Sequence, residues 1–360
     1  MPALPFGSKL SDSDILSKLY DFDDQIIVGD VKFNAETLSV APRPFSRISI
    51  FETIDVNSVK LKSLNSFILD KAQLLEKKRH NVALKKAFDD LQRFWRDQDN
   101  ARCLSDGLKR VKCKRDLQVL LSVHLFGKLK LCALIAEKHA GFKCCCGCGR
   151  SPSLGKTCIG SADTWHGELD ILIKDDLSEV SVLCETNPNS DSPENNRTNI
   201  EEKFACNFIA DCNEQASAQA ITFGFVEKNR HCERLGFPFS RTFLITEDKI
   251  KLIMYDSRSD VLISTEELNL IPVPNGLEET AVIVWLFLNL HLFVVSLNSD
   301  ILSGFTPCGF RSAANRGGGI GFFESIKFYS SEVRAVGGFK FPVECIGKKR
   351  LLFSQKNPSK

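Results

Sequence analysis

Three acidic side chains border two short apolar runs near the middle of the chain. Glu168 and Asp170 stand at the start of the run 169–173, and Glu185 directly follows the run 180–184. A carboxylate beside a buried strand costs desolvation free energy unless a cation or hydrogen-bond donors satisfy it. The pattern therefore predicts a positively charged group or ion at this place.

A β-hairpin would bring these carboxylates together. The two apolar runs are separated by the polar sequence KDDLSE, which is typical of a hairpin turn. If the turn is centred on its middle two residues, Asp170 faces Leu183 and Glu168 faces Glu185. All three acidic side chains then project from one face, because side chains alternate along a strand. Diagonal neighbours lie about 7 to 8 Å apart, so these carboxylates can converge on one ion.

The chemistry of such a cluster follows from its ligand type. Carboxylates are hard oxygen ligands of the kind that Mg²⁺ and Mn²⁺ prefer. An ion held this way can activate a bound water and stabilise charge on a phosphoryl oxygen. The acidic residues therefore predict phosphodiester cleavage as the leading chemistry.

The elements expected to position these residues form an α/β core over residues 116–298. Apolar residues at helical spacing predict helices over 59–99, 116–139 and 200–227. Besides the hairpin, short apolar runs predict strands over 241–246, 249–256 and 260–263. We expect a sheet flanked by helices. An N-terminal strand and helical extension (1–115) precedes this core, and a glycine-rich C-terminal tail (299–360) follows it.

The cysteines indicate an intracellular protein. The chain has fourteen cysteines and no basic start followed by an apolar run, so we expect reduced thiols in the cytoplasm or nucleus. Within the segment GFKCCCGCGRSPSLGKTC, a zinc ion could be held by Cys144, Cys146, Cys148 and Cys158. Their spacing matches neither paired C-x-x-C knuckles nor a Cys2His2 pattern, so we expect a reduced structural loop rather than a zinc site.

Charge and hydropathy leave two further expectations. The net charge of +2 gives no general prediction of nucleic-acid or membrane binding, but residues 77–115 hold 13 Lys or Arg against 5 Asp or Glu. This stretch is either a solvated helix face or a surface for the phosphates of DNA or RNA. The apolar segment 280–297 approaches the length of a membrane span, but Asn289 and His291 interrupt it and favour a buried helix. Nothing in the sequence predicts an oligomeric state.

Several stretches carry a family resemblance: TWHGELDIL (164–172), VLCETN (182–187), QASAQAITFGFVEKNRH (215–231), and KLIMYDSRSDVLIS (251–264) leading to VWLFLNLHLF (284–293). Together they resemble the PD-(D/E)xK nuclease superfamily with its restriction-endonuclease-like fold. The resemblance is closer to an uncharacterised invertebrate family with that core. It covers residues 116–298, roughly half the chain, and implies a magnesium-dependent nuclease.

The resemblance assigns roles to individual residues. Asp170 takes the place of the motif aspartate and Glu185 that of the motif glutamate, both of which bind metal in active relatives. Glu137 resembles an auxiliary acidic position on the preceding helix. Gln215 corresponds to a residue that relatives place near the active site. His166, beside Trp165, is more typical of a structural hydrogen-bonding residue than of a ligand.

One departure from the family pattern bears on activity. Asn187 stands where active relatives have the motif lysine, and Leu169 stands where the motif has a proline. Loss of such a charged group typically costs about 10²- to 10³-fold in rate, or ~3 to 4 kcal/mol. Some relatives carry the lysine on a neighbouring element, which makes Lys203 or Lys174 a candidate replacement. The alternative is a catalytically inactive nuclease fold that binds nucleic acid or protein.

Overall fold

The computed structural model describes most of the chain between residues 10 and 326. The ranges are 10–20, 43–45, 57–59, 71–130, 132–161, 163–174, 179–186, 201–231, 238–246, 248–265, 267–270, 276–293 and 305–326. Residues 1–329 belong to one compact unit, and the second unit, 330–360, lies outside the described ranges.

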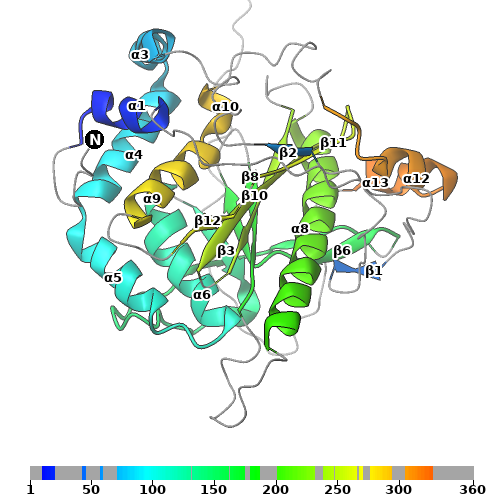
Figure 1. The fold of residues 1–360 in the computed structure, drawn as a ribbon, viewed down its shortest axis with the longest axis horizontal. Helices are drawn as coiled ribbons and strands as arrows, with labels where there is room; N and C mark the ends of the chain where they lie inside the picture. The colour runs from blue at the N-terminus through cyan, green and yellow to red at the C-terminus, as the bar shows by residue number, and fades with distance from the viewer. Residues whose placement is uncertain are drawn as a thin grey trace, which may run out of the picture. The chain divides into compact units, whose positions relative to one another are not determined.

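A mixed nine-stranded sheet forms the centre of the described part of the chain (Figure 1). In spatial order its strands are β2 (Asn57–Val59), β11 (Val261–Thr265), β10 (Lys249–Asp256), β9 (Ser240–Ile245), β8 (Glu179–Cys184), β7 (Ile171–Lys174), β3 (Ala133–Ala136) and β4 (Ser153–Gly155), with β12 (Leu268–Asn269) paired to β10. A small second sheet has the order β1 (Arg43–Pro44), β6 (Trp165–Glu168) and β5 (Cys158–Ile159). Strand β8 runs antiparallel to β7 and parallel to β9.

Helices cover both faces of the large sheet. They are α1 (Asp12–Tyr20), α3 (Lys71–His80), α4 (Val82–Arg96), α5 (Gln98–Leu108), α6 (Lys114–Leu121), the π-helix η3 (Ser122–Phe126), α7 (Gly127–Leu129), the 3₁₀ turn η4 (Glu137–His139), α8 (Glu201–His231), α9 (Gly276–Leu288), α10 (Leu290–Phe293), α12 (Phe310–Arg316) and α13 (Ile320–Glu324). In Figure 1, α8 lies on one side of the sheet, and α4, α5, α6 and α9 lie on the other. The predicted α/β class, a sheet flanked by helices with a helical N-terminal region, is confirmed.

The alternation of strand side chains divides the core into two apolar clusters. Along β9, Phe243 and Ile245 pack in the cluster under α4 and α9, whereas Leu244 packs in the cluster under α8. This is the expected result of a side-chain period of two in a strand buried on both faces. The site-bearing strands are therefore held between two apolar layers.

The predicted hairpin register is confirmed where the two strands pair. Ile171 lies opposite Val182 and Lys174 lies opposite Glu179, as a turn centred between 176 and 177 requires. The pairing of Glu168 with Glu185, however, is wrong. Strand β7 begins at Ile171, and Glu168 ends β6 in the second sheet, where its partner is Cys158. The chain changes sheets at residues 169 and 170, so the alternation cannot be extended back to Glu168.

The predicted helix over 116–139 is too long. The helical segment α6–η3–α7 ends at Leu129, and Lys130 has the extended backbone angles φ −142° and ψ 143°. Residues 133–136 then form the buried strand β3, which pairs with β7 and β4. A short, fully buried strand and a buried helical turn have the same apolar pattern, which explains the error.

The apolar segment 280–297 is a buried helix over its described part. Helix α9 carries the fully buried Trp285, whose indole nitrogen donates to the Ala87 carbonyl at 2.7 Å. The Arg241 guanidinium, from β9, donates to the carbonyls of Phe287 and Leu288 at the end of α9. Among the described residues, no helix is long and apolar enough to cross a membrane. Residues 294–297 lie outside the described ranges.

Contacts cross both boundaries of the expected 116–298 core. Helix α6 starts at Lys114 and so spans the expected boundary at 115, and Phe88 of α4 packs edge-on against Trp285 of α9 with ring centroids 5.2 Å apart. Across the boundary at residue 298, the ring centroids of Phe310 in α12 and Trp165 in β6 lie 5.0 Å apart. Residues 327–360 of the expected tail lie outside the described ranges.

Candidate functional site

Asp170 is the centre of a hydrogen-bonded group at the start of β7. Its Oδ1 accepts from Gln118 Nε2 at 2.7 Å, and its Oδ2 accepts from the backbone N–H of Cys184 at 2.8 Å. The ammonium of Lys114 lies 3.0 Å from the same Oδ2. Three donors therefore converge on a carboxylate whose side chain is only 11% exposed.

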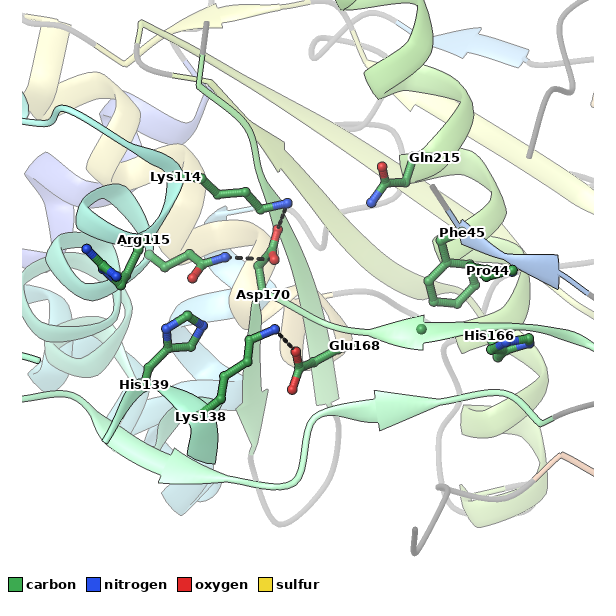
Figure 2. Close-up of a pocket in the computed structure, with 12 residues that line it drawn as sticks. Pro44, Phe45, Lys114, Arg115, Lys138, His139, His166, Glu168, Asp170 and Gln215 are labelled. Atoms are coloured by element: carbon green, nitrogen blue, oxygen red, sulfur yellow. Dashed lines mark hydrogen bonds and ion pairs between the residues drawn. The ribbon is translucent and has the colours of Figure 1, made fainter. Parts of the chain in front are cut away.

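Lys114 joins Asp170 to Glu185. Its Nζ also donates to Glu185 Oε1 at 2.7 Å, so both carboxylates lie within hydrogen-bonding distance of one cation. Lys114 is the first residue of α6, and its side chain reaches across to the β7–β8 hairpin (Figure 2). The positive group predicted from the sequence is therefore the ammonium of Lys114.

Burial and charge oppose one another at this ion-paired group. Burial raises the pKa of Asp170 to about 6, and the nearby Glu185 adds to the rise, although Lys114 and the Cys184 N–H act to lower it. Burial acts to lower the pKa of Lys114, but Asp170 and Glu185 outweigh this effect and raise it above its ordinary value. Near neutral pH Asp170 and Lys114 are therefore both charged.

The group opens onto a cavity of about 390 Å³. Besides Asp170, Lys114 and Gln118, the cavity is lined by Pro44, Phe45, Arg115, Lys138, His139, His166, Gly167, Glu168 and Gln215. Figure 2 shows Gln215 entering from α8 on the side opposite Arg115 and His139. Lys138 and Glu168 form an ion pair in the wall. Burial lowers the pKa of His139, and the positive charges of Lys138 and Arg115 lower it further.

The structure brings most of the predicted acidic residues to this cavity, but in different roles. Asp170 and Glu168 line it, and Glu185 joins Asp170 through Lys114. Glu168 is paired with Lys138 instead of sharing a cation with the other two. Glu137 is exposed in η4, is not on a helix preceding the site, and does not line the cavity.

The remaining predicted residues are placed as follows. Gln215 and His166 line the cavity, and a ring nitrogen of His166 lies 2.9 Å from the Thr164 carbonyl, in agreement with a structural role. Lys174 stands at the far end of β7 from Asp170. Asn187 lies outside the described residues, as does the side chain of Lys203.

Sequence reasoning missed the residues that α6 contributes. Lys114 and Arg115 belong to the basic stretch 77–115, which gave a signal of charge but not of position. Gln118 follows one helical turn after Lys114, so both side chains lie on the same face of α6. Only the packing of α6 beside the hairpin shows that this face reaches Asp170.

The basic stretch is partly neutralised along its own helices. Several of its cations form pairs three residues apart with acidic neighbours, namely Arg79–Glu76, Arg93–Asp90, Arg102–Asp99 and Lys109–Asp106. Other basic side chains, including Lys85, Lys86 and Arg96, are exposed. The stretch is thus a solvated face over much of its length, and its last residues enter the candidate site.

The cysteine-rich loop contains a second group with potential ligand atoms. Donor atoms within 4.8 Å of one another belong to His124, Cys144, Cys146 and Cys148, hereafter the Cys3His cluster. This cluster could hold a metal ion such as zinc. The ligand set considered from the sequence is corrected, because Cys158 lies in β5, near Glu168, and the fourth residue is His124 of η3.

Comparisons with known proteins give no family for the chain. No protein-family model matches it, and no significant match is found among curated proteins or solved structures. The geometry of the two groups above is therefore the basis for assigning a function.

Proposed function

We propose that the protein is a Mg²⁺- or Mn²⁺-dependent phosphodiester hydrolase that acts on nucleic acid. The observation that carries this proposal is that Asp170 and Glu185 share one cation at the edge of a cavity of about 390 Å³. The resemblance of residues 164–187 to the PD-(D/E)xK superfamily supports the same two residues as metal ligands.

The donor set fits a hard divalent ion. Asp170 and Glu185 supply carboxylate oxygens that already approach a single positive charge. Gln118 adds an amide oxygen, Oε1, that is buried and has no hydrogen-bond partner among the described residues. Mg²⁺ and Mn²⁺ take oxygen ligands of this kind and retain several waters. When bound here, such an ion would supply an activated water and stabilise charge on a phosphoryl oxygen.

Lys114 can take the role left open by Asn187. An ammonium beside the two carboxylates supplies the positive field that stabilises developing negative charge on a phosphate, or orients the attacking water. Its position at the start of α6 differs from the expected substitutes Lys203 and Lys174. Because Lys114 occupies the space between the carboxylates, we expect it to shift toward the phosphate when a divalent ion enters.

Nearby cations can bind the substrate backbone. Arg115 and Lys138 both line the cavity, and Lys138 is paired with Glu168. Exposed basic residues of α4, such as Lys85 and Arg96, extend the positive charge along the same part of the chain. Contacts of this type bind phosphates without reading base sequence. We therefore propose DNA or RNA as the substrate class.

An intracellular location, cytoplasmic or nuclear, fits this proposal. Each cysteine whose side chain the structure describes is a free thiol, which is typical of a reducing compartment.

A second function is favoured by the same ion pair. If Lys114 remains between Asp170 and Glu185, it neutralises one carboxylate and excludes a divalent ion. The protein would then be a non-catalytic module that keeps the cavity and binds nucleic acid or protein.

A cleavage assay separates the two functions. Purified protein is incubated with single- and double-stranded DNA and RNA in the presence of Mg²⁺ or Mn²⁺. We expect cleavage of at least one substrate, reduced about 10²-fold or more by Asp170→Ala because the metal loses a ligand. Glu137→Gln is the matched control, since Glu137 is exposed and does not line the cavity. Binding without cleavage of any substrate would instead support the non-catalytic module.

A further inference from the structure

The Cys3His cluster joins two segments that are distant in sequence. Cys144, Cys146 and Cys148 lie on one loop, and His124 comes from the π-helix η3, twenty residues upstream. His124 Nε2 lies 3.2 Å from Cys146 Sγ and 3.3 Å from Cys148 Sγ. In a tetrahedral zinc site, Zn–S and Zn–N bonds place nitrogen and sulfur about 3.5 Å apart. The observed separations are close to this value.

The hydrogen bonds of His124 determine which of its ring nitrogens carries the proton, and the other nitrogen then has a free lone pair. Asn100 donates its Nδ2 to the His124 carbonyl at 2.8 Å, and a carbonyl can only accept. The atom that lies 2.8 Å from His124 Nδ1 is therefore Asn100 Oδ1, an acceptor, so Nδ1 carries a proton and donates it in this hydrogen bond. In a neutral imidazole whose Nδ1 carries the proton, Nε2 has a free lone pair, and Nε2 is the nitrogen that faces Cys146 and Cys148. A hydrogen bond to the outer ring nitrogen is the usual support of a metal-binding histidine.

The backbone of both segments is shaped around the cluster. Gly147 and Gly149 have φ angles of +86° and +72°, in a region that favours glycine, and they let alternate cysteines turn inward. On the other segment, η3 is a single π-helical turn, a feature that often marks functional positions in helices. The side chains of Cys146 and Cys148 are half-buried, and His124 and Cys144 are buried.

The surroundings suit a thiolate-bound metal. Three thiolates and a Zn²⁺ ion carry a net charge of −1, which needs positive neighbours when it is partly buried. Arg110 donates to the Cys146 carbonyl at 3.1 Å, and Arg150 and Lys128 are the main charges acting on His124. Soft thiolates with one imidazole select zinc over hard cations such as Mg²⁺.

We propose that one zinc ion binds, in a closed four-coordinate structural site, to His124, Cys144, Cys146 and Cys148. Four protein ligands leave no open position for a substrate, so the ion ties the loop to η3 and takes no part in catalysis. The loop also carries Phe142, whose ring lies 3.9 Å from the Arg115 guanidinium in the cavity wall. The zinc site therefore supports one side of the candidate active site, and it stands whether or not that site is catalytic.

The test is metal content. Full-length protein produced with zinc in the medium is exchanged into metal-free buffer and measured by inductively coupled plasma mass spectrometry. We expect about one zinc per chain, reduced at least fivefold by Cys146→Ser. Two matched controls, Cys145→Ser and Cys158→Ser, should retain the ion, since Cys145 is adjacent to two ligands without being one and Cys158 lies in β5.

A second measurement uses wild-type protein, so it tests the proposal even if Cys146→Ser fails to fold. Titration of folded wild-type protein with an organomercurial reagent should release zinc in step with the modification of three thiols. Wild-type protein that contains no zinc after production with the metal would overturn the proposal. Retention of zinc in Cys146→Ser, or its loss in both control variants, would overturn the assigned ligand set.

Discussion

At the scale of single residues, Asp170 shows most clearly that the site is not optimised for stability. Its carboxylate is buried among three donors, and burial nonetheless raises its pKa to about 6. A carboxylate whose ionised form is costly in the folded state is typical of a site kept for function. Lys114 and the Cys184 N–H reduce this cost without removing it.

This pKa gives a prediction for stability against pH. The unfolded chain ionises Asp170 near pH 4, and the folded protein does so near pH 6, so the folded state binds the proton more tightly. The free energy of unfolding should therefore fall as pH rises through this window. Asp170→Asn removes this ionisation. The free energy of unfolding of the variant, relative to that of the wild-type protein, should therefore rise by roughly 1 to 3 kcal/mol between about pH 4 and pH 8.

Urea unfolding at several pH values measures this difference. Asn offers fewer acceptor sites to the three donors, which adds a cost that does not depend on pH and cancels in the comparison. Asp163→Asn, at an exposed position, reports the effect of removing a surface charge. If the Asp170→Asn difference does not change with pH, the carboxyl group is not destabilised by burial as described.

At the scale of elements, α6 determines how the site is assembled. Its N-terminus lies beside Asp170 and Glu185, and a helix N-terminus favours negative charge. Lys114 and Gln118, one turn apart, both donate to Asp170. The β7–β8 hairpin could be predicted with its register from alternation and a polar turn, because both signals are local. The position of α6 could not, because it depends on packing between distant segments.

Helix α6 begins with an unused capping position. Cys113 has the extended backbone of an N-cap residue, φ −153° and ψ 164°, but its side chain makes no capping hydrogen bond. Cys113→Ser should supply that bond and raise the free energy of unfolding by about 0.5 to 1 kcal/mol. Chemical denaturation measures the gain, and Cys103→Ser, within α5, is the control. A loss of stability in Cys113→Ser would show that this helix start is satisfied in another way.

The Cys3His cluster is a second feature that local sequence patterns do not predict, because it depends on how two separate elements pack together. The spacing of Cys144, Cys146 and Cys148 matches no common zinc motif, and His124 appeared only as part of an apolar helical stretch. The π-helical turn η3 rotates the helix locally, and local periodicity does not predict such a turn. From the sequence we considered Cys158 as the fourth residue of a zinc site that we did not expect, whereas folding places His124 beside the three cysteines.

At the scale of the whole molecule, the candidate site crosses the expected division of the chain. The α/β class and most strands of the 116–298 region could be predicted, since buried strands and long helices have strong local patterns. Lys114, which pairs with Asp170, comes from the expected N-terminal extension, and the helices of that extension pack with α9 in one apolar cluster. The extension is thus part of the structure that forms the site.

The central claim is that Asp170 and Glu185 hold a divalent ion and that Lys114 acts on the substrate beside it. The most direct test measures Mn²⁺ affinity and cleavage rate for Lys114→Ala, with Lys109→Ala on the nearby exposed surface as control. We predict a loss in rate of about 10²- to 10³-fold, with Mn²⁺ affinity kept or increased because the competing ammonium is gone. An unchanged cleavage rate in Lys114→Ala, or Mn²⁺ affinity that survives Asp170→Ala, would contradict the account.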